Sequence, residues 1–176
     1  MKTIIKELTI YDYEDLKKDN ELCNDIYQEF WLDDPNNINP YSDENLDSFK
    51  EFANTLYMTF DYSLSYAEYP DRSCYIKLKP DPYYDLSNKD YKELLKDYEG
   101  NGFFFCDDLK TFTLDLLNNK QYEVLCEWTS NNLASEIQNK MFDLWFQDNQ
   151  YYFSKESFLN SVEANNYKFD KDGNLV

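Results

Sequence analysis

Carboxylate side chains dominate one stretch of this sequence. From Asp19 to Phe49, "DNELCNDIYQEFWLDDPNNINPYSDENLDSF" contains no lysine or arginine. Like charges four residues apart destabilise a helix by about 0.2 to 0.5 kcal/mol, so an ordinary surface helix mixes the two signs. The candidate partner-binding residues are therefore the nine acids of this stretch and the acid that follows it, Glu51. The full set is Asp19, Glu21, Asp25, Glu29, Asp33, Asp34, Asp43, Glu44, Asp47 and Glu51.

The remaining residue types exclude most catalytic chemistry. Histidine is absent, which removes the commonest general base, the Ser-His and Cys-His pairs and most zinc sites. The chain has three glycines and neither a GxxxxGK[ST] nor a GxGxxG motif. "KFDKDGNLV" is similar to an acidic calcium loop, but Gly173 at the sixth position would put Lys168 at the first, where a carboxylate is needed. We predict no catalytic residues, no metal site, no cofactor and no enzymatic activity. A hydrolase that uses two carboxylates is the remaining enzymatic alternative, but carboxylates occur throughout the chain, so their presence does not point to such a site.

The net charge restricts the class of partner. The chain carries a formal charge of −18 and has a pI near 4.2, so it should bind neither nucleic acid nor an anionic membrane surface. Its electrostatic complement is a basic surface, as found on nucleic-acid-binding proteins. Thirteen acids and one base, Lys50, lie between Asp19 and Asp71, whereas "SNKDYKELLKDYEG" mixes both signs. The acidic segment is either a solvated face that keeps the protein soluble or a functional face.

A functional face of this kind could imitate DNA if its charges cluster. A globule of 21.3 kDa exposes roughly 9,000 Å², or about 500 Å² per net charge, whereas a duplex carries a charge on the order of every 100 Å². Clustering along helices would close this gap, because residues four apart on a helix rise by about 6 Å, close to phosphate spacing.

Two predicted helices would arrange the acids in rows. In the first, Glu21, Asp25 and Glu29 (row one) lie opposite an apolar face, which consists of Leu22, Cys23, Ile26, Tyr27, Phe30 and Trp31. Prolines in "LDDPNNINPY" end this helix, and Ser42 is a candidate N-cap for the second. There Asp43, Asp47 and Glu51 (row two) accompany inward residues, which are Leu46, Phe49, Phe52, Ala53 and Leu56.

The rest of the pattern predicts an α+β fold. Residues 3–10 indicate a strand, and "YMTFDYSLSY" and "SCYIKLK" alternate as a central hairpin. Helices are predicted after Ser87, after "FFFC", over residues 121–150 and after Ser154, and a small hairpin is predicted around Asp172-Gly173. Two alternatives stay open: a buried strand at "FFFC" and a break of the long helix near "TSNN". We predict one acidic domain over residues 1–176, with a small antiparallel sheet covered by helices that include one long C-terminal helix.

Composition indicates a folded protein outside the membrane. Aromatic residues make up 19% of the chain, unlike disordered acidic chains. No apolar run approaches the ~18 residues of a membrane span, and the N-terminus is too charged for a signal peptide. We expect a cytoplasmic monomer or homodimer whose scattered cysteines are structural thiols.

The two ends of the chain carry a family resemblance. "KELTIYDYEDL" and "FSKESFLNSVEANNYKFDKDG" resemble small acidic phage and mobile-element proteins of low-GC bacteria, which share a TIYxFxEL opening and an ANxYxFxxDG ending. The matching positions are Tyr11, Asp15, Leu16, Ala164, Asn165, Tyr167, Phe169, Asp172 and Gly173.

The resemblance implies a phage-borne origin and a location in the host cytoplasm. Phages make acidic inhibitors that occupy the nucleic-acid grooves of restriction or CRISPR nucleases, and this chain is similar to them in size, charge and aromatic content. The expected activity is anti-CRISPR or antirestriction inhibition through a basic nucleic-acid-binding partner. The alternatives are an antitoxin that binds a basic toxin directly and an adaptor whose acidity serves only solubility.

Overall fold

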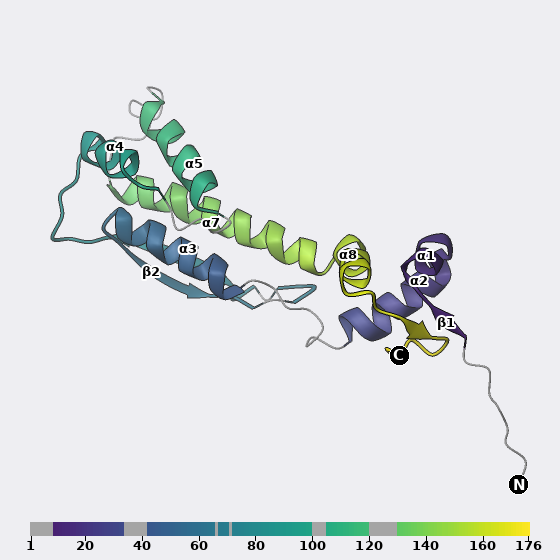
Figure 1. Ribbon diagram of the computed structural model, residues 1–176. Coiled ribbons are helices and arrows are strands. Elements are labelled where there is room, and N and C mark those ends of the chain that lie inside the picture. The colour runs from purple at the N-terminus through teal and green to yellow at the C-terminus, as the bar shows by residue number, and fades with distance from the viewer. Residues whose placement is uncertain (1–8, 34–41, 66, 71, 100–104, 120–129) are drawn as a thin grey trace, which may run out of the picture. The chain divides into compact units, whose positions relative to one another are not determined.

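The computed structural model describes residues 9–33, 42–65, 67–70, 72–99, 105–119 and 130–176 (Figure 1). The chain divides into two compact units: unit 1 comprises Met1–Pro40 and Asp148–Val176, and unit 2 comprises Tyr41–Gln147. Each unit has its own buried cluster of apolar side chains. That the two units fold and unfold together as a single domain stays a prediction.

Unit 1 is built from both ends of the chain. Its elements are β1 (Ile10–Tyr11), α1 (Tyr13–Lys18), α2 (Asn20–Ile26), the π-helix η1 (Tyr27–Leu32), α8 (Lys155–Asn165) and β4 (Phe169–Asp170). β1 pairs antiparallel with β4, with Tyr11 opposite Phe169. The core between these elements consists of Leu16, Cys23, Ile26, Trp31, Phe158, Val162 and Phe169.

Local caps explain where the helices of unit 1 begin. Asp12 and Asp15 form a capping box at the start of α1. Asp19 ends α1 and caps α2, because its carboxylate accepts from the backbone N–H groups of Glu21 and Leu22. Ser154 caps α8, as the sequence predicts. Helix α1 is not among the predicted elements.

The predicted helix that carries row one ends in a π-helical turn, η1. Two of its side chains bond across unit 1: the Tyr27 hydroxyl donates to the carbonyl of Phe153, and Trp31 Nε1 donates to that of Tyr152 at 3.0 Å. The last carbonyls of a helix have no intrahelical partner, and Tyr152 is the last residue of α7 (Ser130–Tyr152). The aromatic residues of η1 therefore complete the end of α7.

Unit 2 contains the central hairpin and most of the long helix. Its elements are α3 (Ser42–Thr55), β2 (Met58–Ser63), β3 (Tyr75–Pro80), α4 (Asn88–Lys96), α5 (Cys106–Asn118) and the part of α7 that ends at Gln147. Ser87 caps α4 in a capping box with Asp90. The hydrophobic core joins α3, the hairpin, α4, α5 and α7.

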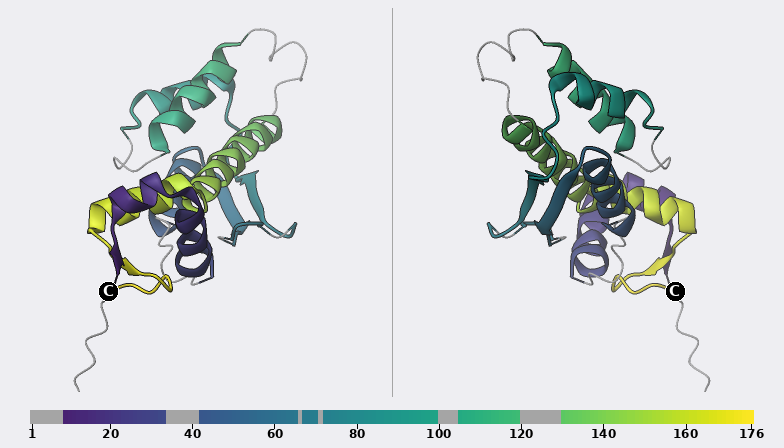
Figure 2. Two further views of the ribbon diagram at one scale, coloured as in Figure 1. Left: turned by 90° about the vertical axis from the view of Figure 1, so that its right-hand side faces the viewer. Right: turned by 90° about the vertical axis from the view of Figure 1, so that its left-hand side faces the viewer.

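The central hairpin is formed by the two predicted strands. β2 and β3 are antiparallel, with Phe60 opposite Leu78. Met58, Ile76 and Leu78 are buried on one face, and α3 and α7 pack on this face (Figure 2). Gln138 of α7 reaches the strand edge, where its Oε1 accepts from the backbone N–H of Leu78 at 3.0 Å.

The fold class is confirmed, with one refinement of the sheet. The described strands form two separate two-stranded antiparallel sheets, β1–β4 and β2–β3, instead of one sheet. Residues 3–8 of the predicted first strand and 121–129 of the predicted long helix lie outside the described residues. Over the described ranges, no helix combines the length and apolar character that crossing a bilayer requires.

The predicted C-terminal turn is held by one carboxylate. Asp170 Oδ1 accepts from the backbone N–H groups of Asp172 at 2.9 Å and Asn174 at 3.0 Å. Gly173 has a φ of +78°, which favours glycine. The hydrogen bonds from Asn174, and then that from Asp172, hold the pKa of Asp170 below its ordinary value.

Acid is therefore expected to loosen this turn. Because the folded pKa is lowered, the stabilisation is present above the ordinary Asp pKa of about 3.9 and is lost as pH falls through the lower folded value. The amide proton shift of Asn174, whose N–H donates to Asp170 Oδ1, should titrate below pH ~3.9 when it is followed by NMR. Asp170→Asn should abolish this titration and Glu163→Gln should not. A midpoint at the ordinary Asp pKa would contradict the assignment.

Candidate functional site

Row one lies on the outer face of α2 and η1. Glu21, Asp25 and Glu29 are exposed, whereas Cys23 and Ile26 on the opposite face are buried. Glu21 and Asp25 are one α-helical turn apart, so their carboxylates lie side by side. The i to i+5 bonding of η1 widens its turn and rotates Glu29 away from the straight line that the sequence predicts. Row one is therefore a bent anionic edge within unit 1.

The acids that flank row one have different roles. The Asp19 carboxylate is engaged at the start of α2, where it accepts two backbone N–H groups at 3.1 Å. Asp33 is exposed just after η1, and its backbone N–H donates to the carbonyl of Gln28. Asp34 lies outside the described residues. Asp33 thus extends the exposed charge, whereas Asp19 also serves the local fold.

Row two on α3 is less exposed than row one. Asp47 is exposed, but Glu51 and its neighbour Glu44 are partly buried. Asp43 belongs to α3, and its side chain lies outside the described residues. The inward face of α3 is buried as predicted, with Phe49, Phe52, Ala53 and Leu56 in the core. Among the described side chains of row two, Asp47 presents its charge most openly.

Glu51 also acts on a neighbouring tyrosine. Burial is the largest cause that raises the pKa of the Tyr98 hydroxyl, followed by the Cys106 thiol and the charges of Glu51 and Asp107. The Glu51 carboxylate is therefore close to the junction of α3, α4 and α5. Its negative charge acts on a side chain of unit 2 and is less available to a partner than that of Asp47.

The described cations leave row one unneutralised. The ion pairs among the described residues join Lys89 to Glu93 at 3.8 Å and Lys171 to Asp172 at 3.9 Å. Lys155 lies beside α2, but its ammonium donates to the side-chain oxygens of Asn20 and Asn24 at 2.6 and 2.8 Å. The exposed carboxylates of row one thus have no ion-pair partner in the described part of the chain.

The two rows belong to different units. Row one lies in unit 1 and row two in unit 2, and each is described by itself. The sequence-based prediction that both rows form one dense patch stays a prediction.

The residues of the opening and ending motifs have structural roles in unit 1. Tyr11 and Phe169 pair across β1 and β4, and Leu16 is buried. A Cβ on Gly173 would lie 3.0 Å from Glu29 Oε2, so glycine also fits the close approach at this turn. Asp15 belongs to the capping box of α1. The opening and ending motifs therefore meet in one unit, where they specify its fold.

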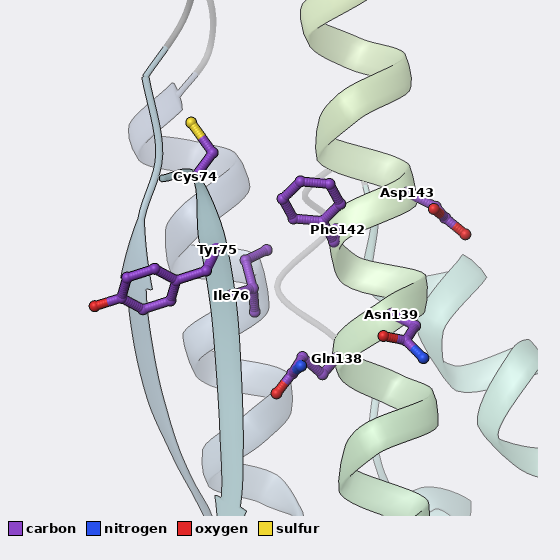
Figure 3. A pocket seen from close by; sticks show the side chains of 7 residues that line it. All are labelled: Cys74, Tyr75, Ile76, Gln138, Asn139, Phe142 and Asp143. Carbon is purple, nitrogen blue, oxygen red and sulfur yellow. The ribbon is translucent and has the colours of Figure 1, made fainter. Parts of the chain in front are cut away.

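A hollow opens between β3 and α7 in unit 2 (Figure 3). It has a volume of about 270 Å³, and its lining includes Cys74, Ile76, Gln138, Phe142 and Asp143. Gln138 points toward the strand, whereas Asp143 points away from it. The hollow therefore brings together no pair of groups suited to proton transfer.

Sequence reasoning missed a second feature of unit 2, a hollow of about 430 Å³ beside α4. Its lining includes Tyr57 and Tyr84, whose ring centroids lie 4.2 Å apart, and the acids Glu93 and Asp97. The "KPDPYYD" segment is correctly predicted as a loop, but no sequence pattern indicates that Tyr84 meets Tyr57.

Comparisons with known proteins add no relative. No protein-family model, curated protein or solved structure matches this chain. Within the described ranges, no group of three or more Cys, Asp or Glu side chains is arranged to hold a metal ion.

Proposed function

We propose that this protein is a non-enzymatic inhibitor, encoded by a phage or mobile element, that acts in the host cytoplasm on a basic defence nuclease of the CRISPR or restriction kind. It binds the positively charged channel of the nuclease and blocks nucleic-acid binding. The observation that supports this proposal is row one: three outward carboxylates, opposite a buried face, without an ion-pair partner among the described lysines and arginines.

Row one supplies the first contact in this mechanism. Lysine and arginine side chains that line a nucleic-acid channel would pair with Glu21, Asp25 and Glu29 in place of phosphates. The α-helical rise of about 6 Å over four residues sets the spacing of the first two charges. Exposed pairs contribute about 0 to 1 kcal/mol each and are screened by salt, so inhibition should weaken as ionic strength rises.

Row two makes the smaller contribution in this proposal. Asp47 is its open charge, whereas Glu44 and Glu51 are partly buried on α3. Changing row two should therefore reduce inhibition less than changing row one.

Neutralising row one tests the proposal. The triple variant Glu21→Gln, Asp25→Asn, Glu29→Gln should inhibit DNA binding by its nuclease about tenfold less, which corresponds to ~1.4 kcal/mol. The measurement is fluorescence anisotropy of labelled DNA on purified CRISPR effectors and restriction nucleases, titrated with the inhibitor at low and physiological salt.

The matched control removes the same charge elsewhere on unit 1. Glu14, Glu156 and Glu163 are exposed and lie outside row one, so the triple change of these residues to Gln should leave inhibition within about twofold. An equal loss of inhibition in both variants would show that only the net charge matters. No loss of inhibition in either variant would refute the role of row one. A non-nuclease basic toxin that row one neutralises would instead support the antitoxin hypothesis.

A further inference from the structure

We infer that the hollow beside α4 is a recognition site for an arginine side chain of the basic partner. Only the class of partner rests on the proposed function, since the hollow lies in unit 2 and shares no residue with row one. The site combines an aromatic wall, an apolar floor and an acidic rim.

The aromatic wall is a pair of exposed tyrosine rings. Tyr57 and Tyr84 are 41% and 46% exposed, and their ring planes are inclined by 30°. The backbone holds them together, because Asp81 donates its N–H to the carbonyl of Tyr57 at 2.9 Å and accepts from the N–H of Tyr84 at 3.1 Å. A guanidinium is attracted to the face of such a ring by about 0.5 to 1 kcal/mol at an exposed site.

The acidic rim is one side of α4. Asp90, Glu93 and Asp97 follow a spacing of three and four residues, so they lie on the same side of the helix. The Asp90 carboxylate is engaged with the backbone N–H and hydroxyl of Ser87 at 2.8 and 2.6 Å. Glu93 pairs with Lys89 at 3.8 Å, but both side chains are exposed, and such pairs contribute little. Asp97 and Glu93 are therefore the carboxylates available to a ligand.

The apolar part of the lining favours a long cationic side chain. The apolar floor consists of Leu86 and Leu94, which line the hollow, are partly buried and pack against the core of unit 2. An arginine side chain can lay its methylene groups on such a floor while its planar head stacks on a tyrosine and pairs with a carboxylate. An ammonium is more strongly hydrated and stacks less well, and an anion would be repelled by the rim. Charge complementarity therefore assigns the hollow to arginine.

A short peptide tests this assignment without the partner. Ac-Gly-Arg-Gly-NH2 is titrated into the full-length protein, with the tyrosine ring signals followed by carbon–proton NMR. The expected result is a saturable shift of the Tyr57 and Tyr84 rings that exceeds any shift of Tyr62 and Tyr75, which are similarly exposed on unit 2. The same peptide with citrulline, which is uncharged and nearly isosteric, should bind about tenfold more weakly.

Variants locate the binding on the proposed wall and rim. Tyr84→Ala, and separately Glu93→Gln with Asp97→Asn, should each weaken arginine binding about tenfold. The matched controls are Tyr83→Ala and the double change Glu99→Gln with Asp108→Asn, because these residues are exposed in unit 2 and do not line the hollow. Tyr84→Leu keeps apolar area without the aromatic face, so it should also lose binding while the fold is retained.

Several results would overturn the assignment. They are equal binding of the citrulline peptide, an equal shift of all four tyrosines, or equal weakening by Tyr83→Ala and Tyr84→Ala. The outcome is separable from that of the proposed function. If the hollow binds arginine but row one has no effect on a nuclease, the arginine site stands and the proposed function does not. If row one inhibits a nuclease but the hollow does not bind arginine, the proposed function stands and the arginine site does not.

Discussion

Replacing Phe158 with alanine is expected to lower the free energy of unfolding by about 3 to 5 kcal/mol. Phe158 is fully buried in unit 1, and its ring contacts those of Tyr27, Trp31 and Phe169 at centroid distances of 5.7, 5.8 and 6.2 Å. Truncation removes the buried ring and leaves a cavity between α8, η1 and β4 that these neighbours can fill only in part. Urea unfolding, followed by the indole N–H signal of Trp31, measures the change.

The control is an aromatic residue of unit 1 that is not buried. Tyr151 on α7 is 44% exposed, so Tyr151→Ala should change stability by less than about 1 kcal/mol. Equal losses for Tyr151→Ala and Phe158→Ala would contradict the assignment of Phe158 to the centre of unit 1. If Phe158→Ala does not fold, Phe158→Leu should show a smaller loss in the same direction.

Replacing Phe52 with alanine is expected to have an effect of similar size in unit 2, about 3 to 5 kcal/mol. Phe52 is fully buried on α3, and its ring meets that of Tyr98 edge to face at 5.4 Å. The change removes the contact that anchors α3 to the end of α4. The indole N–H signal of Trp145, which is buried in unit 2, reports this unfolding. Exposed Asn54 on the same helix supplies the control Asn54→Ala, which should stay within about 0.5 kcal/mol.

The two variants together test the prediction of one domain. The chain passes between the units at Pro40–Tyr41 and again inside α7, at Gln147–Asp148. If the units unfold as one domain, Trp31 and Trp145 should report the same midpoint in the wild type and in both variants. Separate midpoints, with each variant shifting only its own unit, would show two domains.

The layout of the charges has a consequence for the proposed mechanism. Row one is exposed in unit 1, and the arginine site lies in unit 2. The opening and ending motifs lie in unit 1, where their residues pair strands, fill the core and close a turn. In the proposed mechanism these two ends of the chain provide the framework for row one, while unit 2 adds its own contacts to the partner.

Local patterns predicted a large part of this fold. The apolar spacing around Ile26 and Phe52 predicted buried helix faces, and the alternation around Ile76 predicted the hairpin. Ser87 and Ser154 predicted two helix starts, because a cap depends only on a hydroxyl and the amides two or three residues later. The outward face of row one follows from the same periodicity, since burying one side of a helix exposes the other.

Long-range contacts decided what these patterns leave open. The π-helical turn of η1 accompanies hydrogen bonds from Tyr27 and Trp31 to carbonyls more than a hundred residues away. The pairing of β1 with β4, the separation of the two rows between units and the meeting of Tyr57 with Tyr84 also join distant segments. The amino-acid sequence alone therefore determined which faces of these helices are buried and that row one lies on an exposed face. Tertiary structure alone decided which outward residues become neighbours, because loop closure and packing, which no local period encodes, bring them together.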